Sequence, residues 1–180
     1  MENDEKLSQS IVQVDNPVLR KKAVDVNIDE IGSEKIQNII SEMKKAMATQ
    51  KDGVAIAAPQ IGYSLRIFVV SDKILSEADK KYKSIGRDLV FINPVITKLS
   101  RNKHEVEEGC LSVRWKYGKV NRSIKASVKA HNELGEVVER GASGLLAQVF
   151  QHETDHLDGI LFIDKAMDIQ DIPPEDNDSK

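Results

Sequence analysis

Two histidines stand one helical turn apart in this chain, with a glutamate directly after the first. The stretch reads Gln151-His152-Glu153-Thr154-Asp155-His156. On a helix, side chains four residues apart share a face and lie roughly 6 Å from each other, so both imidazoles reach one metal ion. The alternative is a pair of core histidines beside a solvated glutamate. Burying two imidazoles and a carboxylate without an ion is costly, which favours the metal site.

The residues around this motif predict a helix over 144–158. Apolar residues at helical spacing form a broad face, and Gly159 provides a C-terminal cap. Because the two histidines and Glu153 interrupt that apolar face, we expect the helix to lie deep in the core. The predicted fold class is α+β, with antiparallel or mixed β-sheets wrapped around this buried C-terminal metal-binding helix.

Apolar periodicity predicts the other elements. Isoleucines and methionines recur at helical spacing over 34–50, where Ser33 is a suitable N-cap, so we expect one N-terminal amphipathic helix. Apolar and polar residues alternate over 120–130, which predicts one half-buried antiparallel strand. The charged stretch 72–88 is expected to be a surface excursion. Further strands are expected at 11–14, 65–70, 89–96 and 136–140.

Composition indicates one globular domain. The chain has 180 residues, 40% of them hydrophobic, which is enough for a proper core. We expect one catalytic domain at 11–165 between flexible tails at 1–10 and 166–180, and a monomer.

The net charge of −3 gives no sign of nucleic-acid binding. No apolar run approaches the roughly 20 residues of a membrane span, and the polar first ten residues do not look like a targeting signal.

The histidine pair needs a third ligand, because a catalytic site of the zinc type has three protein ligands and one open position. Cys110 is the only cysteine, and a free thiol fits the reducing cytoplasm. Taken alone, such a cysteine is most often a small buried hydrophobic residue. His104 and His131 are the other candidates, and both stand in polar surroundings. Cys110 follows Gly109 where the sequence turns from polar to apolar, so a backbone turn there can aim it inward.

A third stretch, 53–62, is rich in small residues and reads Gly-Val-Ala-Ile-Ala-Ala-Pro-Gln-Ile-Gly. No Gly-Lys-Ser/Thr follows, so it is not a phosphate loop. Small side chains permit the close approach of another backbone, and the side-chain amide of Gln60 can donate to an oxyanion. A tight packing turn is the commoner explanation of such a stretch taken alone.

Together, the three stretches resemble the peptide deformylase family. Its motifs are Gly-x-Gly-x-Ala-Ala-Pro-Gln, Glu-Gly-Cys-Leu-Ser and Gln-His-Glu-x-x-His-x-x-Gly, which correspond in order to 53–60, 108–112 and 151–159. Similar flanking segments extend the resemblance over 11–165. The resemblance implies removal of the formyl group from the N-terminal formyl-methionine of newly made polypeptides. It also implies one Fe²⁺ per chain, in a site that Zn²⁺, Ni²⁺ or Co²⁺ can occupy, and imidazole and thiolate ligands suit these ions.

The resemblance assigns roles to the metal ligands and to the base. Cys110, His152 and His156 would hold the ion, which lowers the pKa of a bound water. Glu153 would not be a ligand. It would take the proton of that water and pass it to the leaving amine, as general base and then general acid.

The resemblance also assigns oxyanion donors and substrate contacts. The side-chain amide of Gln60 and the backbone N–H of Leu111 would stabilise the oxyanion. The substrate backbone would lie like a strand along the small-residue stretch, because main-chain bonds tolerate varied side chains. Substrate contacts are expected from Gly53, Val54, Ala55 and Trp115.

Arg122 interrupts the apolar phase of 120–130. A charge on a buried face needs a partner. The family pairs the glutamate of its second motif with a downstream arginine, and this pair corresponds to Glu108 and Arg122. Such a pair would orient the turn that carries Cys110. An ordinary surface ion pair is the alternative.

The chain departs from the family pattern in three places. Ala55 replaces the second glycine of the first motif. Residues 114–117 are larger than the proline and small residues of many members, so that Trp115 either lines the cleft or packs on its rim. The acidic C-terminus does not resemble the helical extension that some members dock on ribosomes.

Two alternative functions stay open: another metallopeptidase or amidase with the same ligands, and a non-catalytic peptide-binding homologue.

Overall fold

The structure is a computed structural model and describes residues 11–174. The expected tail at 1–10 and the last residues of the one expected at 166–180 therefore lie outside the described part. Within it, the chain forms an α+β fold with antiparallel sheets, as predicted. The helices are α1 (Glu34–Ala48), α2 (Asp72–Ala78) and α3 (Gly144–Leu157). The strands are β1 (Ala55–Ala57), β2 (Ile67–Val70), β3 (Leu89–Leu99), β4 (Lys103–Cys110), β5 (Val113–Ser123), β6 (Lys125–His131), β7 (Val137–Ser143) and β8 (Met167–Asp171).

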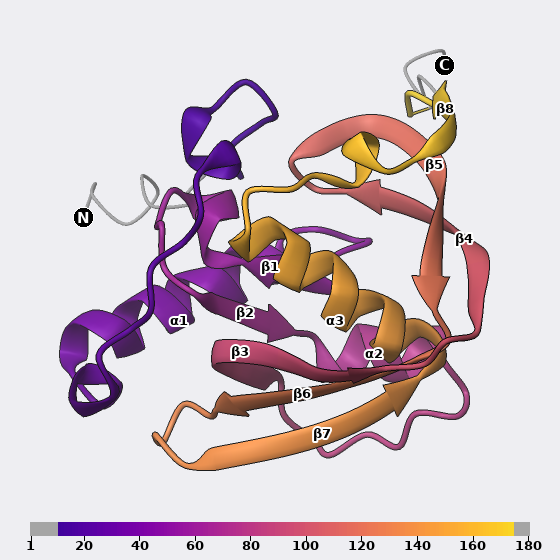
Figure 1. Cartoon of the computed structure of the whole chain (residues 1–180). Coiled ribbons are helices and arrows are strands. Elements are labelled where there is room, and N and C mark those ends of the chain that lie inside the picture. Colours follow the sequence, from indigo (N-terminus) through magenta and orange to yellow (C-terminus); the bar gives the residue numbers. More distant parts are fainter. Residues whose placement is uncertain (1–10, 175–180) are drawn as a thin grey trace, which may run out of the picture.

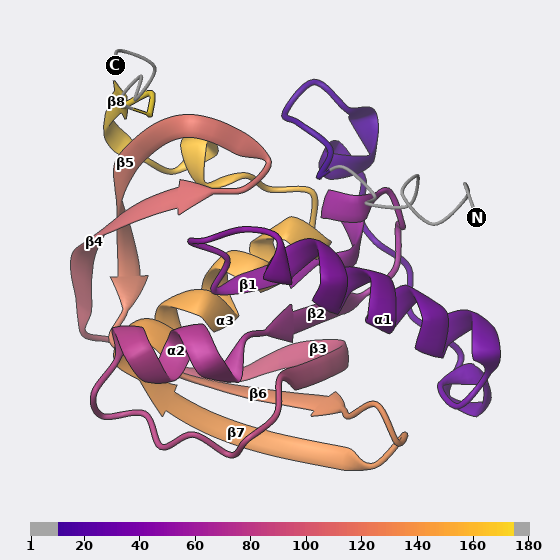
Figure 2. The same ribbon diagram turned by 180° about the vertical axis from the view of Figure 1, so that it is seen from behind.

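The strands form two sheets. A five-stranded sheet has the order β1-β2-β3-β6-β7, and a three-stranded sheet has the order β4-β5-β8. Helices α1 and α3 cover opposite faces of the larger sheet (Figures 1 and 2). None of the helices between residues 11 and 174 has the length and apolar composition of a membrane-spanning segment.

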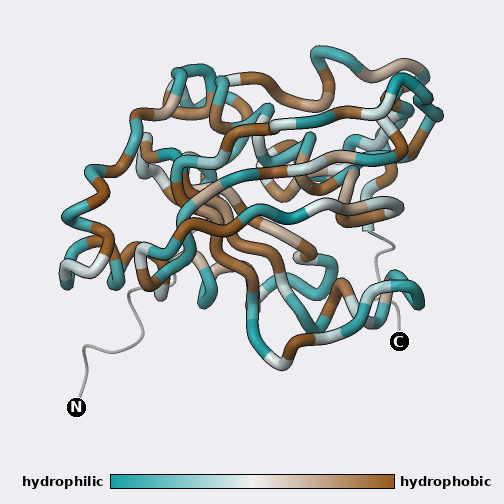
Figure 3. Tube along the Cα trace, turned by 60° about the horizontal axis from the view of Figure 1, so that its bottom comes forward, coloured by the Kyte–Doolittle hydropathy of each residue, from teal (hydrophilic) through white to brown (hydrophobic). Residues whose placement is uncertain are grey.

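Strand β2 shows how the core divides around the larger sheet. Phe68 and Val70 join the apolar cluster that contains the buried residues of α3. Ile67 and Val69 point the other way, into the cluster that contains the buried face of α1. All four are buried because successive strand side chains point to opposite faces, and both faces are covered. Apolar chain segments accordingly gather in the interior, with hydrophilic segments at the outer loops (Figure 3).

The first residue of α1 and the glycine that follows α3 are found where the sequence indicates, whereas α1 ends at Ala48, two residues before the expected 50. Ser33 caps α1, with its hydroxyl oxygen accepting from the N–H of Ile36 at 3.3 Å. Beyond α3, Gly159 has φ +76°. A Cβ at that position would lie 2.7 Å from the carbonyl oxygen of Arg20, so both the conformation and the packing require glycine.

The single strand expected at 120–130 is wrong. β5 and β6 are separated at Ile124 and belong to different sheets. At this break, the side chain of Gln151 on α3 replaces a neighbouring strand. Its amide oxygen accepts from the N–H of Ser123 at 3.0 Å, and its nitrogen donates to the carbonyl of Ser123 at 2.9 Å. In the sequence, apolar and polar residues go on alternating through the break, which is why periodicity alone does not reveal it.

Two segments near the ends of the described chain also differ from expectation. Residues 11–14 form no strand, although the Val12 N–H donates to the carbonyl of Gln60 at 2.9 Å. The acidic composition of 166–180 predicts a flexible tail, whereas Met167–Asp171 forms β8 on the edge of β5. Main-chain pairing needs no apolar residues, and Lys116 adds an ion pair to Asp171 at 2.7 Å.

The stretch 72–88 is not only a surface excursion, because α2 begins it with a buried carboxylate. Asp72 accepts hydrogen bonds from the hydroxyls of Tyr82 and Ser84 at 2.6 and 2.5 Å. It also accepts from the backbone N–H groups of Ile85 and Gly86 at 2.9 and 3.0 Å. The Asp72 side chain therefore ties the start of α2 to residues 82–86 of the connection to β3.

Strand β3 is longer than the range expected at 89–96. Proline restricts a strand position to a sheet edge or a bulge. β3 lies inside the sheet, between β2 and β6, and its register shifts between Ile92 and Val95. Pro94 therefore stands at a bulge.

Candidate metal centre

Cys110, His152 and His156 come together where β4 ends beside α3. Their ligand atoms all lie within 4.8 Å of one another, and Cys110 Sγ is 3.2 Å from His156 Nε2. Bonds of ~2.3 Å to sulfur and ~2.1 Å to nitrogen at a tetrahedral angle put two such atoms roughly 3.6 Å apart. The three side chains therefore fit one ion. A thiolate and two imidazoles suit iron, zinc, cobalt or nickel better than magnesium or calcium.

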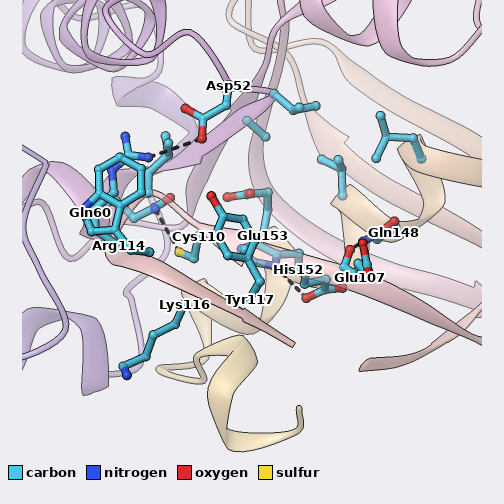
Figure 4. Close-up of a pocket in the computed structure, with 18 residues that line it drawn as sticks. Asp52, Gln60, Glu107, Cys110, Arg114, Lys116, Tyr117, Gln148, His152 and Glu153 are labelled. Atoms are coloured by element: carbon cyan, nitrogen blue, oxygen red, sulfur yellow. Dashed lines mark hydrogen bonds and ion pairs between the residues drawn. The ribbon is translucent and has the colours of Figure 1, made fainter. Parts of the chain in front are cut away.

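Cys110, His152 and Glu153 line a cavity of about 280 Å³ (Figure 4). Glu153 is only 4% exposed. Among residues 11–174, its Oε2 is one of the buried polar atoms that have no hydrogen-bond partner. An unpartnered buried carboxylate oxygen is costly unless a ligand or water bonds to it. The structure thus brings a buried carboxylate beside the three candidate ligands, as the sequence leads us to expect.

Glu108 holds one of the two imidazoles. Its Oε2 lies 2.9 Å from His152 Nδ1, which leaves Nε2 of that ring available to an ion. Both oxygens of Glu108 also accept from Arg122, at 2.7 and 2.9 Å. Arg122 is 4% exposed, so this is a buried pair rather than a surface pair. Asp155, which the sequence analysis did not single out, accepts the third bond of Arg122 at 2.7 Å.

These contacts determine the charges around the site. Burial alone would raise the pKa of Glu108, but Arg122 and His152 outweigh it and lower that pKa to about 2. Burial likewise opposes charge on Cys110, and the neighbouring His156 and His152 lower the pKa of the thiol to about 5. Both groups are thus held as anions, which is the form that a metal ligand and its supporting carboxylate need. Burial raises the pKa of Glu153, in keeping with a base that binds and releases a proton.

Gln60 faces Cys110 from the opposite segment. It follows β1, and its amide oxygen accepts from the backbone N–H of Ala57 at 2.8 Å. This bond leaves the amide nitrogen directed at the Cys110 turn, where it lies 3.2 Å from Ser112 Oγ and 3.6 Å from Cys110 Sγ. The orientation of the amide is therefore set by a main-chain donor, and its nitrogen points to the Cys110 turn at the cavity wall.

The turn after β4 presents Cys110 and Leu111 to the cavity. Cys110 pairs with Val113, so Leu111 and the buried Ser112 form a two-residue connection. Gln13 braces this connection from outside, donating to the carbonyl of Leu111 at 3.0 Å and accepting from the N–H of Arg114 at 3.4 Å. Nothing in the sequence pattern indicates this role of Gln13, because the contact spans about a hundred residues.

The small-residue stretch contributes to the cavity only in part. Val54 and Ala55 line it. Gly53 does not, and a Cβ there would lie 2.8 Å from the carbonyl oxygen of Met47, so its packing against the end of α1 requires glycine. β1 is the edge strand of its sheet within the described chain, so its outer side is open to an added strand.

Two labelled residues mark unlike ends of the cavity, because Gln148 and Arg114 lie on opposite sides of Cys110 and Glu153 (Figure 4). Gln148 donates to the carbonyl of Glu107 at 2.9 Å, and apolar Leu145 and Val149 line the cavity from the same helix, so we call this the apolar end. Trp115, which also lines the cavity, lies against the guanidinium of Arg114. His104 and His131, the other histidines of the chain, belong to β4 and β6 and are not part of the ligand cluster.

Known proteins share both the sequence and the fold. Residues 8–171 match the family model described as Polypeptide deformylase. Peptide deformylase 1A (chloroplastic/mitochondrial) of Arabidopsis thaliana is 42% identical over 165 residues, which cover 87% of this chain and 61% of that protein. Peptide deformylase of Pseudothermotoga lettingae is 45% identical over 150 residues, which cover 83% of this chain and 77% of that protein.

Among solved structures, a peptide deformylase from Acinetobacter baumannii bound to Met-Ala-Ser is similar with a TM-score of 0.76 and 31% identity. The match covers 86% of this chain and 96% of that chain. The chain spans less than two thirds of the length of the Arabidopsis relative. It spans most of the length of each of the two bacterial proteins. The family model spans nearly the whole described region, including the three candidate ligands. The chain therefore belongs to the polypeptide deformylase family.

Proposed function

We propose that this chain removes the formyl group from the N-terminal formyl-methionine of newly made polypeptides, using a metal ion held by Cys110, His152 and His156. The observation that carries the proposal is the position of Glu153, whose Oε2 is buried and unpartnered beside these three side chains. A divalent ion held there would lower the pKa of water and polarise a carbonyl oxygen. Family membership and the ligand types favour Fe²⁺, with Zn²⁺, Ni²⁺ or Co²⁺ as substitutes.

Glu153 moves the proton in this proposal. Its Oε2 accepts a proton from the attacking water and returns it to the nitrogen of the leaving amine, so that the amide bond breaks without releasing a free amide anion. The raised pKa that burial gives this carboxyl brings it closer to the working pH, which suits both halves of the transfer.

Gln60 and Leu111 stabilise the oxygen on which negative charge develops. The amide nitrogen of Gln60 is directed at the Cys110 turn because its oxygen is held by Ala57. Leu111 offers a backbone N–H from the same turn, which Gln13 braces. Donors that are fixed before the reaction stabilise a developing oxyanion without reorganising.

The substrate would bind as an added strand on the open edge of β1, beside Val54 and Ala55. Its first side chain would enter the apolar end of the cavity, at Leu145 and Val149. Methionine is flexible and apolar and suits such a pocket. The related Acinetobacter protein binds Met-Ala-Ser, a peptide that begins with methionine.

The proposal also covers the role of α3, the extent of the catalytic domain, the compartment and the oligomeric state. α3 is the metal-binding helix around which the two sheets fold, within one catalytic domain that extends past the expected boundary at 165 to include β8. We also propose a cytoplasmic monomer, on the grounds of the free thiol and the family. It acts on nascent chains.

A panel of peptides tests the proposal. Formyl-Met-Ala, acetyl-Met-Ala and an unformylated peptide with internal bonds are each incubated with anaerobically purified, metal-loaded protein. We expect release of formate from the first and no reaction with the other two. Cleavage of internal bonds without release of formate would instead indicate a metallopeptidase. Binding without turnover of any peptide would indicate a non-catalytic homologue.

A further inference from the structure

Residues 114–116 leave the β4–β5 ladder beside the cavity. Gly109 pairs with Tyr117 and Cys110 pairs with Val113, so one step on β4 corresponds to four on β5, and the three residues form a bulge. All three line the cavity. Bulges are frequent beside active sites, where they redirect side chains.

Trp115 stands in the middle of this bulge in a strained conformation. Its φ is +64°, in the left-handed region that bulky residues rarely adopt. Trp115 is 40% exposed although it lines the cavity. Backbone strain of this kind persists only where the surroundings hold it, and it is concentrated at ligand-binding sites.

Strand β8 and the residue that follows it hold the backbone of the bulge. The carbonyl of Trp115 accepts from the N–H of Ile172 at 2.7 Å. The next residue, Lys116, pairs with Asp171 in the β5–β8 ladder. The bulge residues do not pair with β4. Trp115 and Lys116 instead pair with the β8 side, and these bonds hold the strained conformation in place.

Arg114 holds the side chain of the bulge. Its guanidinium lies 5.3 Å from the centre of the Trp115 ring and covers one face of the indole. The same group donates to Asp52 Oδ2 at 3.3 Å and to the side chain of Gln50. Because Asp52 precedes β1, this bridge joins the two walls of the cavity.

Figure 4 shows Arg114 and Gln148 on opposite sides of Cys110 and Glu153. In the proposed function, the first substrate side chain occupies the end of the cavity at Gln148. A peptide that extends past the reacting amide toward Trp115 therefore brings a later residue to the indole. The exposed part of the ring offers that residue an apolar, aromatic surface.

We propose that Trp115 is a specificity-determining residue that stacks on an aromatic side chain of the substrate at a position after the first. This inference rests on the proposed function and names the substrates that the chain prefers. An aromatic pair of this kind is expected to raise kcat/KM by about three- to tenfold over alanine.

The kinetic test places phenylalanine or alanine in turn at the second, third and fourth positions of formyl-Met peptides. The wild type should prefer phenylalanine at one position. Trp115→Gly, which tolerates the positive φ, should bring that ratio close to one, and Trp115→Phe should retain most of it. Leu134→Ala is the matched control, an exposed apolar residue outside this cavity, and should keep the wild-type ratio. Equal rates for all peptides in the wild type, or an unchanged ratio in Trp115→Gly, would overturn the inference.

A second readout needs no turnover, because Trp115 is the only tryptophan of the chain. Met-Ala-Phe and its isomers with phenylalanine at other positions are titrated into the Zn²⁺-loaded protein. We expect the tryptophan fluorescence to change with the preferred aromatic peptide and not with Met-Ala-Ala. No change with any aromatic peptide overturns the inference. Failure of formyl-Met-Ala to react would overturn the proposed function separately, since the fluorescence change does not depend on it.

Discussion

Glu108 orients the ring of His152 through a contact of 2.9 Å between Oε2 and Nδ1. The other ring nitrogen is thereby left to the metal site. Arg122 fixes the same carboxylate with two hydrogen bonds. A supporting group of this kind sets both the orientation and the basicity of a histidine ligand.

Glu108→Gln should therefore weaken metal binding by roughly 10- to 100-fold. The amide keeps the size of the side chain but removes the charge that faces His152 and Arg122. Metal content after dialysis against a graded chelator series measures the effect. Glu105→Gln is the matched control, because Glu105 lies on the same strand in an exposed ion pair with Lys119. Equal metal retention in both variants would contradict the role of Glu108.

Gln60→Leu should reduce kcat/KM for formyl-Met-Ala by roughly 10²- to 10³-fold, the usual loss when one oxyanion donor is removed. Metal content should stay unchanged, because Gln60 is not a candidate ligand. Ser112→Ala removes only the hydroxyl that accepts from Gln60 and should cost much less. A folded Gln60→Leu variant with wild-type kcat/KM would show that the amide does not contact the reacting group.

Gln151→Leu should lower the free energy of unfolding by about 2–4 kcal/mol, because the N–H and the carbonyl of buried Ser123 both lose their partner. Urea denaturation of the two proteins measures the difference. Gln148→Leu provides the comparison on the same helix, since it loses one bond at an exposed site. Equal destabilisation of the two variants would mean that the break between β5 and β6 does not depend on Gln151.

Asp72 gives a pH-dependent prediction away from the metal site. Burial raises the pKa of this carboxyl, but the hydrogen bonds of Ser84, Tyr82 and two backbone N–H groups lower it from 3.8 to about 2. Because the folded pKa lies below the unfolded one, the ionised group stabilises the fold above pH 4, and this contribution is lost as the pH falls toward 2.

The wild type should therefore be more stable than Asp72→Asn at pH 7, and the difference should shrink below pH 4. Urea midpoints at several pH values measure it. Glu77→Gln, an exposed acid on the same helix, should show no such change. A difference between the wild type and Asp72→Asn that stayed constant from pH 7 to pH 3 would contradict the assignment.

The sequence predicts a contact correctly where a charged residue stands on an otherwise apolar face and so needs a buried partner. Arg122 interrupts an apolar phase, which predicts a buried partner, and the structure pairs it with Glu108. The three motif stretches likewise meet in space, since Gln60, Cys110 and His152 line one cavity and His156 lies against Cys110.

Sequence reasoning fails where long-range main-chain contacts decide the structure. β8 forms because β5 offers an open edge, and an acidic composition carries no sign of that. The alternation over 120–130 hides the break at Ile124, because Gln151 satisfies the interrupted ladder from a distant helix. The bulge at Trp115 is invisible for the same reason, since it depends on the register between β4 and β5.

The central claim is that Glu153 acts as the base beside a metal ion, and one comparison tests it most directly. Formate release from formyl-Met-Ala is measured for anaerobically purified wild type and for Glu153→Gln, with metal content determined in the same samples. We predict turnover by the wild type and a loss of at least ~10²-fold in the variant, with the metal retained. Turnover by metal-loaded Glu153→Gln within a few-fold of the wild type would contradict the claim, as would a metal-loaded wild type that releases no formate.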